Sequence, residues 1–579
     1  MSSRLSPRWI RAVAVAALFL AASCEKDPND ATTWIPKLKD SGGLDEAVRN
    51  LNRLKDLRAV EPLGEAWKKW NKPSKILRAM IDISNFDDAS GKKAYIVRHP
   101  DYKSALPYLI EAVKEYDPSL QQSIEDGAIA ADALGKSGDP AAVEVLVNTA
   151  NKSMPKTSPA NRVRAASIRA LGHFKDPRAI DTLIKILGAD PETQDVRLHA
   201  NAALALAETG DPKALPALAK AAFVGPIFSQ VREGFTRAGK AAVPVAMQIF
   251  DGKQPDVLAY AAEKDFKKNA PGAMVFKGAL LLGDLRAAEA VPKLIAELKK
   301  PTQPIGFDPR TGAEQGTSHA GVLDALRRIG DPAAADPVYD YMIDDKTDDF
   351  LLRPLAMDVY SMIATDTKAL PWLLKMIKDE AADPNVRNAA VIAYGRLARS
   401  SDDAAPIKAL IADYDARVKK AEAKVKAAKG EQDKGAAEQE QMTAEGFEGG
   451  LKEAQARIEI AAKCKQDPAC YADALDAKDV AVGQPGLPRA ERALLEIRKM
   501  GKKGQPVYKK LLDAKYLGTS ERIVREAILL ALPRIAPLPC KDCVDAMDKV
   551  MDSQASQTTL DLLNKETKIV YHYFLWAGT

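Results

Sequence analysis

An Asp-Pro dipeptide recurs at nearly constant spacing, and this spacing constrains the fold more than any other feature of the chain. The first three copies are separated by 37 and then 35 residues, and a fourth copy follows later. The four copies are Asp139-Pro140, Asp176-Pro177, Asp211-Pro212 and Asp331-Pro332. A period in this range is typical of a solenoid, in which each repeat stacks only on its neighbours.

The residues around each Asp-Pro predict a pair of helices joined by a very short turn. Apolar residues recur every three or four positions both before the turn, from Val163 to Gly172, and after it, from Ala179 to Leu187. Asp is a strong helix N-cap, and Pro is favoured at the first helical position. We therefore expect Asp139, Asp176, Asp211 and Asp331 to cap the second helix of their repeats.

The repeat resembles the HEAT repeat, in particular the short bacterial HEAT-like type. That type has the pattern Val-Arg-x-x-Ala-Ala-x-Ala-Leu-Gly, then Asp-Pro, then a second helix. Val163-Arg164, Val196-Arg197 and Val386-Arg387 carry its first half, and the four Asp-Pro turns carry its second half. The match is specific over residues 120 to 220 and good from 275 to 410. The resemblance implies an all-α fold, an α-solenoid of stacked HEAT-like helix pairs.

Residues 403–463 interrupt the period and predict an inserted antiparallel helical hairpin. Apolar residues from Ile407 to Ala428, and again from Phe447 to Ala461, alternate spacings of four and three, as in a coiled coil. Gly430 and Gly435 bracket a polar turn between the two arms. Two interpretations stay open, either a protruding arm that contacts a partner or two elongated helices of one repeat.

A second interruption spans Lys300 to Thr317 and is rich in Pro, Gly and polar residues. This composition predicts a long loop. Such a loop either decorates one face of the array or is a disordered insertion.

The N-terminus predicts export and attachment to a membrane. Arg4, Arg8 and Arg11 precede an apolar run that is too short to span a bilayer, and small residues then lead directly to Cys24. This order resembles a bacterial lipobox, which would make Cys24 the lipidated first residue of the mature protein; the alternative is an ordinary signal peptide. Glu25 favours the outer membrane or periplasmic side of the cell envelope over the inner membrane.

These patterns divide the chain into consecutive segments. They are a signal peptide (1–23), a tether (24–33), HEAT-like repeats (34–402), the hairpin (403–463) and C-terminal HEAT-like repeats with a cap (464–579). The cap is expected to consist of aromatic residues that cover the exposed end of the array. They are Tyr571, Tyr573, Phe574 and Trp576.

Four further cysteines occur as two close pairs, Cys464 with Cys470 and Cys540 with Cys543. In an exported chain this predicts two short structural disulfides. The alternative for Cys540 is a redox thiol, since a helix start would lower its pKa. A thioredoxin-like site, however, needs a βαβ setting that a helical chain lacks.

The sequence contains no motif that predicts an enzyme, a cofactor or a metal. It has no phosphate-binding loop, no dinucleotide fingerprint and no nucleophile elbow. None of its five histidines has the spacing of a metal site or the paired His-Glu motifs of the HEAT-like iron hydroxylase. The net charge of +5 falls further when the three signal arginines are removed, which argues against nucleic acid as a partner.

The leading hypothesis is a lipid-anchored, non-enzymatic scaffold that binds protein partners of the cell envelope through its concave surface, loop and hairpin. The competing hypothesis is an enzyme, either a HEAT-like lyase or a thiol-redox protein that uses Cys540 and Cys543. A DNA-binding HEAT protein is a third, and the export signal and near-neutral charge both count against it.

Overall fold

The computed structural model describes most of the chain after the predicted signal. The described residues are 27–84, 102–264, 270–307, 310–311, 313–476, 478, 481 and 483–578. They pack as two compact units that divide between Thr209 and Gly210. Cys24 and the rest of the lipobox-like segment lie outside the described residues, as does His99. Within those ranges, no helix combines the length and apolar character needed to cross a membrane.

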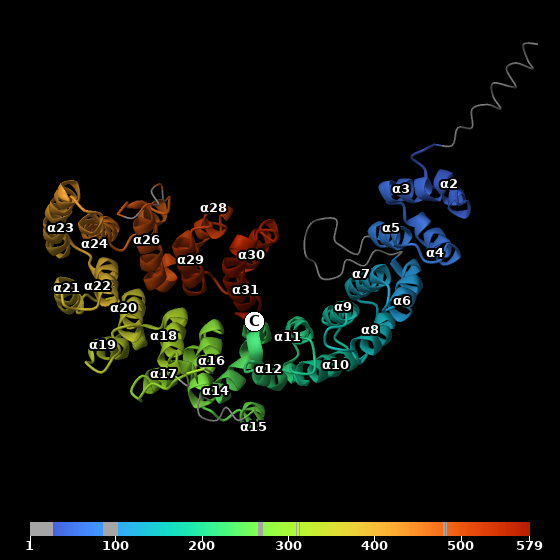
Figure 1. Cartoon of the computed structure of the whole chain (residues 1–579), viewed down its shortest axis with the longest axis horizontal. Helices are drawn as coiled ribbons and strands as arrows, with labels where there is room; N and C mark the ends of the chain where they lie inside the picture. The colour runs from blue at the N-terminus through green and yellow to red at the C-terminus, as the bar shows by residue number, and fades with distance from the viewer. Residues whose placement is uncertain are drawn as a thin grey trace, which may run out of the picture. The chain divides into compact units, whose positions relative to one another are not determined.

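Unit 1, which ends at Thr209, consists of paired helices in two rows. The helices are α2 (Ala31–Trp34), α3 (Leu44–Leu54), α4 (Val60–Lys69), α5 (Ser74–Ser84), α6 (Leu106–Lys114), α7 (Gln121–Ser137), α8 (Val143–Ala150), α9 (Asn161–Leu171), α10 (Pro177–Gly188) and α11 (Val196–Thr209). Short 3-10 turns are η1 (Ile35–Lys39), η2 (Leu57–Ala59), η3 (Tyr102–Ser104) and η4 (Pro140–Ala142). Helices α5, α7, α9 and α11 form the inner row, and α4, α6, α8 and α10 form the outer row (Figure 1).

The Asp-Pro turns close one helix and open the next with almost no loop. The carboxylate of Asp176 accepts a hydrogen bond of 2.8 Å from the backbone N–H of Arg178, and α10 begins at once with Pro177. Asp139, Asp211 and Asp331 accept the same bond from the residue two positions ahead. Gly138 ends α7 with φ at 57°, a left-handed conformation that only glycine adopts without strain.

The Leu-Gly pair of the repeat lets neighbouring inner helices approach closely. A Cβ at Gly135 would lie 2.7 Å from the Cα of Ala170, and one at Gly172 would lie 2.8 Å from the Cα of Ala205. Both distances are shorter than a carbon–carbon contact, so no larger residue fits without moving a helix. The glycines of Leu134-Gly135 and Leu171-Gly172 therefore set the spacing of the inner row.

Unit 2, from Gly210 onward, continues the same pairing. Its helices are α12 (Leu215–Ala221), α13 (Phe228–Ala238), α14 (Val243–Phe250), α15 (Pro255–Glu263), α16 (Ala270–Asp284), α17 (Val291–Glu297), α18 (Ser318–Ile329), α19 (Ala335–Ile343), α20 (Leu352–Ile363), α21 (Leu370–Lys378), α22 (Pro384–Leu397), α23 (Ser401–Ala427), α24 (Glu431–Cys464), α25 (Pro468–Asp473), α26 (Gly486–Met500), α27 (Tyr508–Leu511), α28 (Ala514–Leu517), α29 (Arg522–Ile535), α30 (Lys541–Ser553) and α31 (Asp561–Trp576). Its 3-10 turns are η5 (Pro212–Ala214), η6 (Gly225–Ile227), η7 (Gly239–Ala242), η8 (Ala288–Ala290), η9 (Pro332–Ala334), η10 (Gly501–Val507) and η11 (Thr558–Leu560).

The inner helices of unit 2 form a closed ring. Each contacts the next in the order α13, α16, α18, α20, α22, α24, α26, α29 and α31, and α31 returns to contact α13 (Figure 1). The indole N–H of Trp576 in α31 donates a hydrogen bond of 2.9 Å to the backbone carbonyl of Thr236 in α13. The C-terminal aromatic residues were expected to cover an exposed end of the array. The structure differs, because α31 packs against the first inner helix of its own unit.

Contacts across the ring fill its centre. Met362 of α20, Leu495 of α26 and Leu530 of α29 form one buried apolar cluster. The repeat pattern predicts an extended curved surface. In unit 2, described helices of the C-terminal part pack against the inner helices that precede them.

The inserted hairpin consists of α23 and α24, which pack antiparallel. Lys424 and Glu440 form an ion pair of 2.7 Å between the arms, and the rings of Tyr414 and Phe447 lie 4.7 Å apart. The turn spans residues 428–430, so Gly435, expected to bracket it, lies inside α24. The second half of α24 packs on α22 and α26 and is an inner helix of the ring.

The segment from Lys300 to Thr317 was expected to be a loop without regular structure. It contains a small antiparallel pair, β1 (Gly306–Phe307) and β2 (Glu314–Gln315), with Gly306 opposite Gln315. The segment is fastened to the start of α18, because the backbone N–H of Ser318 donates to the carbonyl of Gln303 at 2.8 Å.

Candidate functional site

Charged side chains link the inner helices of unit 1 across their exposed face. Arg162 of α9 pairs with Glu125 of α7 at 3.3 Å, and Arg169 of α9 pairs with Asp132 of α7 at 3.0 Å. The side chains of Arg162 and Arg169 are 57% and 46% exposed. Pairs this exposed contribute little to stability, about 0–1 kcal/mol each. Their groups are therefore available to exchange these partners for groups on another molecule at small cost.

A polar groove lies between these helices. We call it the inner-face groove, and its volume is about 310 Å³. Its lining residues come from α7, from α9 and the residue pair after it, and from α11. They are Asp132, Lys136, Arg169, His173, Leu204, Ala205 and Glu208. His173 lies 3.7 Å from Glu208. Arg169 and Lys136 together with Asp132 and Glu208 give the groove both signs of charge beside the apolar residues Leu204 and Ala205.

In unit 2 the inner face carries buried charged side chains that form ion pairs between helices. Glu491 of α26 is 3% exposed and receives the guanidinium groups of Arg396, at 2.5 Å, and Arg457, at 2.8 Å. Burial alone would raise the pKa of Glu491, but the two arginines lower it to about 2. Arg396 also pairs with Asp358 of α20, so one network joins α20, α22, α24 and α26.

A second buried group continues along α26. Glu496 is 1% exposed and pairs with Arg399 at 2.7 Å and with Arg492 at 3.2 Å. Lys499 lies 3.6 Å from the same carboxylate, yet burial lowers the pKa of this lysine to about 7. These networks join the inner helices of the ring to one another.

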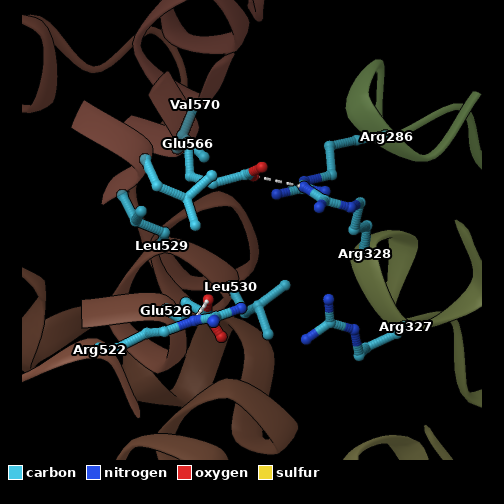
Figure 2. Close-up of a pocket in the computed structure, with 10 residues that line it drawn as sticks. Arg286, Arg327, Arg328, Arg522, Glu526, Leu529, Leu530, Glu566 and Val570 are labelled. Atoms are coloured by element: carbon cyan, nitrogen blue, oxygen red, sulfur yellow. Dashed lines mark hydrogen bonds and ion pairs between the residues drawn. The ribbon is translucent and has the colours of Figure 1, made fainter. Parts of the chain in front are cut away.

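A third cluster opens into a pocket between two walls of unit 2 (Figure 2). We call it the arginine pocket, and its volume is about 90 Å³. One wall carries Arg286, Arg327 and Arg328, which follow or belong to α16 and α18. The other wall comes from α29 and α31 and carries both charged and apolar residues. They are Arg522, Glu526, Leu529, Leu530, Leu562, Glu566 and Val570.

The cysteine pairs lie where the spacing predicts. The sulfur atoms of Cys464 and Cys470 are 1.96 Å apart, and those of Cys540 and Cys543 are 2.02 Å apart, both at disulfide-bonding distance. Cys540 is the N-cap of α30, and its sulfur accepts a bond of 3.2 Å from the backbone N–H of Cys543. Cys540 and Cys543 are 3% and 0% exposed, so both are buried.

Three of the described histidines are buried and take part in packing. His199 approaches the carbonyl of Leu187, His319 the hydroxyl of Tyr341, and their Nδ1 distances are 3.3 and 2.9 Å. His572 of α31 lies with Nδ1 3.1 Å from the hydroxyl of Thr236. Across the described ranges, no group of three or more His, Cys, Asp or Glu side chains is arranged to hold a metal ion.

Comparison with known proteins agrees with this architecture. Residues 154–232 match the family model described as HEAT repeats, and residues 128–151 match the model described as the PBS lyase HEAT-like repeat. The chain contains HEAT repeats. No curated protein matches it significantly.

The chain is also similar to solved structures at low sequence identity. Importin beta is 12% identical, over 97% of this chain and 75% of its own, with a TM-score of 0.41. The complex of CpcE and CpcF of phycocyanin lyase from Nostoc is 18% identical, over 49% of this chain and 91% of its own, with a TM-score of 0.22.

Sequence analysis missed the buried charge networks of this HEAT-repeat protein. Glu491, Arg492 and Glu496 lie in a segment rich in Arg, Glu and Lys, a composition that is usual for a solvated helix face. Nothing in the local pattern separates them from exposed charges. The ring, in which α26 faces α20 and α22, is what buries them.

Proposed function

We propose that this HEAT-repeat protein is a membrane-anchored lipoprotein of the cell envelope that acts as a non-enzymatic, protein-binding scaffold. The inner-face groove of unit 1 is the surface that carries this proposal. It combines exposed side chains of both charges with a shallow apolar floor at Leu204 and Ala205. A polypeptide offers backbone donors and acceptors together with charged side chains, and such a groove can satisfy both.

The two units differ in how exposed the charged side chains of their inner helices are, and this difference supports separate roles for them. The inner helices of unit 2 bury their charges against one another, as at Glu491, whereas Arg162 and Arg169 of unit 1 remain about half exposed. In this proposal unit 2 is a rigid support for the molecule, and unit 1 is the part that binds the partner protein. The partner would be an envelope protein whose contacting segment carries alternating acidic and basic residues, since the groove does the same.

Anchoring rests on the sequence of the N-terminus. Diacylation at Cys24 would place the lipid only a few residues before α2, which begins at Ala31. So short a tether would hold unit 1 close to the membrane surface, on the outer-membrane or periplasmic side that Glu25 favours.

A thiol-redox function is the second candidate, and one observation favours it. Cys540, at the N-terminus of α30, is joined to Cys543 in a Cys-x-x-Cys disulfide, an arrangement that disulfide oxidoreductases also have. Against it, Cys540 and Cys543 are both buried. Replacing both cysteines with serine separates the candidates. A scaffold keeps its partner and loses only stability, whereas a redox protein loses disulfide exchange with a model dithiol.

Site-specific photocrosslinking in cells tests the scaffold. A photoreactive amino acid at Arg169, in the inner-face groove, should yield one dominant adduct with an envelope protein. The same probe at Glu144, an exposed residue of the outer-row helix α8, is the matched control and should yield none. Equal adducts at both positions, or none at Arg169, would refute a partner site in the groove.

A test of whether the hairpin binds the partner needs a smaller change than deletion of residues 403–463. That deletion would remove the half of α24 that belongs to the ring. Replacing residues 422–440 with a short Gly-Ser turn shortens the arms and leaves the buried residues Leu451, Ala454 and Ile458 in place. Unchanged crosslinking in this variant supports recognition by the groove, and loss of the adduct moves the partner site to the hairpin.

Membrane attachment has its own test. In the Cys24→Ser variant the protein should move from the membrane to the soluble fraction, and metabolic labelling with a fatty acid should disappear. Labelling that persists in the variant would contradict lipidation at Cys24.

A further inference from the structure

The arginine pocket and the groups joined to it contain more arginines than carboxylates. Six arginines, in the pocket or joined to it, stand against four carboxylates. The arginines are Arg232, Arg286, Arg327, Arg328, Arg498 and Arg522, and the carboxylates are Asp284, Asp324, Glu526 and Glu566. The excess corresponds to two positive charges.

The carboxylates are already engaged. Glu566 forms ion pairs with Arg328 at 2.7 Å and with Arg232 at 3.4 Å. Glu526 forms an ion pair with the exposed Arg522 at 2.6 Å. Asp324 is shared by Arg327 and Arg328, at 2.6 Å each. No carboxylate that lines the pocket is left over to neutralise a further arginine.

Of these six arginines, Arg286 and Arg498 are the two that form no ion pair with any described residue. Arg286 follows α16 in a left-handed conformation, with φ at 53°, and its guanidinium donates only to the carbonyl of Gly283, at 2.9 Å. Arg498 is 2% exposed and donates through Nη2 to the backbone carbonyl of Arg327, while its Nη1 is buried without a hydrogen-bond partner.

Burial is the main cause of a lowered pKa in both groups. Burial lowers the pKa of Arg286 to about 10, and the nearby charge of Arg328 lowers it further, whereas the carboxylates of Asp284, Glu566 and Asp324 raise it. Burial likewise lowers the pKa of Arg498 to about 9, with Arg286, Arg327 and Arg534 adding repulsion. A guanidinium is normally protonated under all conditions, so such repulsion marks a site where an anion would be strongly stabilised.

We propose that the arginine pocket binds a small divalent oxyanion of the phosphate class, with Arg286 and Arg327 as its principal ligands. The guanidinium fork matches the oxygen spacing of such an ion and bonds to it in a bidentate manner. Two negative charges balance the excess. The pocket volume of about 90 Å³ suits a free ion rather than a nucleotide.

The position of the pocket gives the anion a structural consequence. One wall belongs to the α16–α18 part of the ring and the other to α29 and α31 (Figure 2). An ion that contacts Arg286 and Arg327 lies beside Leu529, Leu530 and Val570, whose apolar side chains exclude water and strengthen the attraction. Binding therefore ties the last helices of the ring to its earlier helices.

Isothermal titration of the full chain with inorganic phosphate at pH 7 tests the proposal, with sodium chloride at matched ionic strength as the control. We expect one site, and we expect Arg286→Gln to weaken binding about tenfold or more because a charge-assisted bidentate contact is lost. Arg178→Gln, an exposed arginine of α10 that pairs with Asp176, should bind as the parent does.

Further experiments control for a folding defect in the variant and distinguish free phosphate from phosphate carried on a larger molecule. Arg327→Gln is the second variant, since Asp324 keeps Arg328 as its partner. Hydrogen exchange in residues 561–576 should slow when phosphate is added to the parent chain and not when it is added to either variant. Phosphoserine tests a phosphate carried on a larger molecule, and binding of either compound supports the site. Absence of binding by both, or binding that is unchanged in both variants, overturns it.

Discussion

The indole N–H of Trp576 donates to the backbone carbonyl of Thr236 at 2.9 Å, although 340 residues separate them in the chain. This contact joins α31 to α13 and closes the inner helices of unit 2 into a ring. Close by, a Cβ at Gly239 would lie 2.7 Å from the ring of Trp576. The end of α13 is therefore shaped to receive the indole. In an open solenoid the last helix has a face exposed to solvent. In unit 2 the last helix, α31, instead packs against α13.

Truncation of this indole should loosen the ring. We expect Trp576→Ala to lower the free energy of unfolding of unit 2 by about 2–4 kcal/mol, since it removes a large apolar contact and a hydrogen bond. Amide hydrogen exchange should accelerate in both α13 and α31. Leu575→Ala is the matched control, because Leu575 is 43% exposed and should change stability little. Faster exchange in α31 alone would argue against a closed ring.

Removing the charge of Glu491 should lower the free energy of unfolding substantially, because this carboxylate pairs with two buried arginines. Glu491→Gln keeps the shape of the side chain but leaves Arg396 and Arg457 without their shared carboxylate. Removing one partner of a buried ion pair costs about 3–5 kcal/mol. Glu459→Gln removes an exposed partner of Arg489, and we expect a loss of no more than about 1 kcal/mol. Denaturant unfolding of the two variants and the parent measures the difference.

Stability should rise between pH 7 and pH 10 because of Lys499. Burial lowers the pKa of Lys499 to about 7 in the folded chain, whereas an unfolded lysine titrates near its ordinary value of about 10.4. Between these values the unfolded state binds more protons, so raising the pH favours folding. Lys499→Met should flatten the dependence of the thermal midpoint on pH in this window. A slope as steep as that of the parent would contradict a neutral, buried Lys499.

Two glycines of unit 1 should respond oppositely to the same substitution. Gly172→Ala forces a Cβ against the backbone of Ala205, and we expect a loss of about 1–3 kcal/mol from overpacking. Gly188→Ala has nothing within 4 Å and lies at the end of α10, so stability should stay equal or rise by up to about 1 kcal/mol. Thermal unfolding of both variants distinguishes close helix approach from a simple preference for glycine.

The helix pairs and their turns could be predicted because their causes are local. Asp176 caps α10 through the residue two positions ahead, and the apolar spacing of α9 and α10 decides which faces are buried. The hairpin also follows from spacing, since the expected seam residues Tyr414 and Phe447 face each other. Its turn was misplaced at one end because Gly435 lies in a helix that packing stabilises despite the glycine.

The candidate sites could not be predicted in the same way, because each depends on residues that the chain brings together from far apart. Arg286, Arg327 and Glu566 line one pocket, although 239 residues separate the last two. In unit 1, the sequence shows Asp132, Arg169 and Glu208 as ordinary solvated charges of three separate helices. Only the stacking of α7, α9 and α11 makes them one groove.

The sequence by itself determined a HEAT-repeat solenoid, because helix periodicity and capping act within one repeat. The tertiary structure decided that unit 2 closes into a ring and buries Glu491 and Arg498 at its centre. Closure depends on the small rotation between successive repeats summed over the whole unit. No short stretch of sequence encodes that sum, and a change of a few degrees per repeat would leave Trp576 far from Thr236.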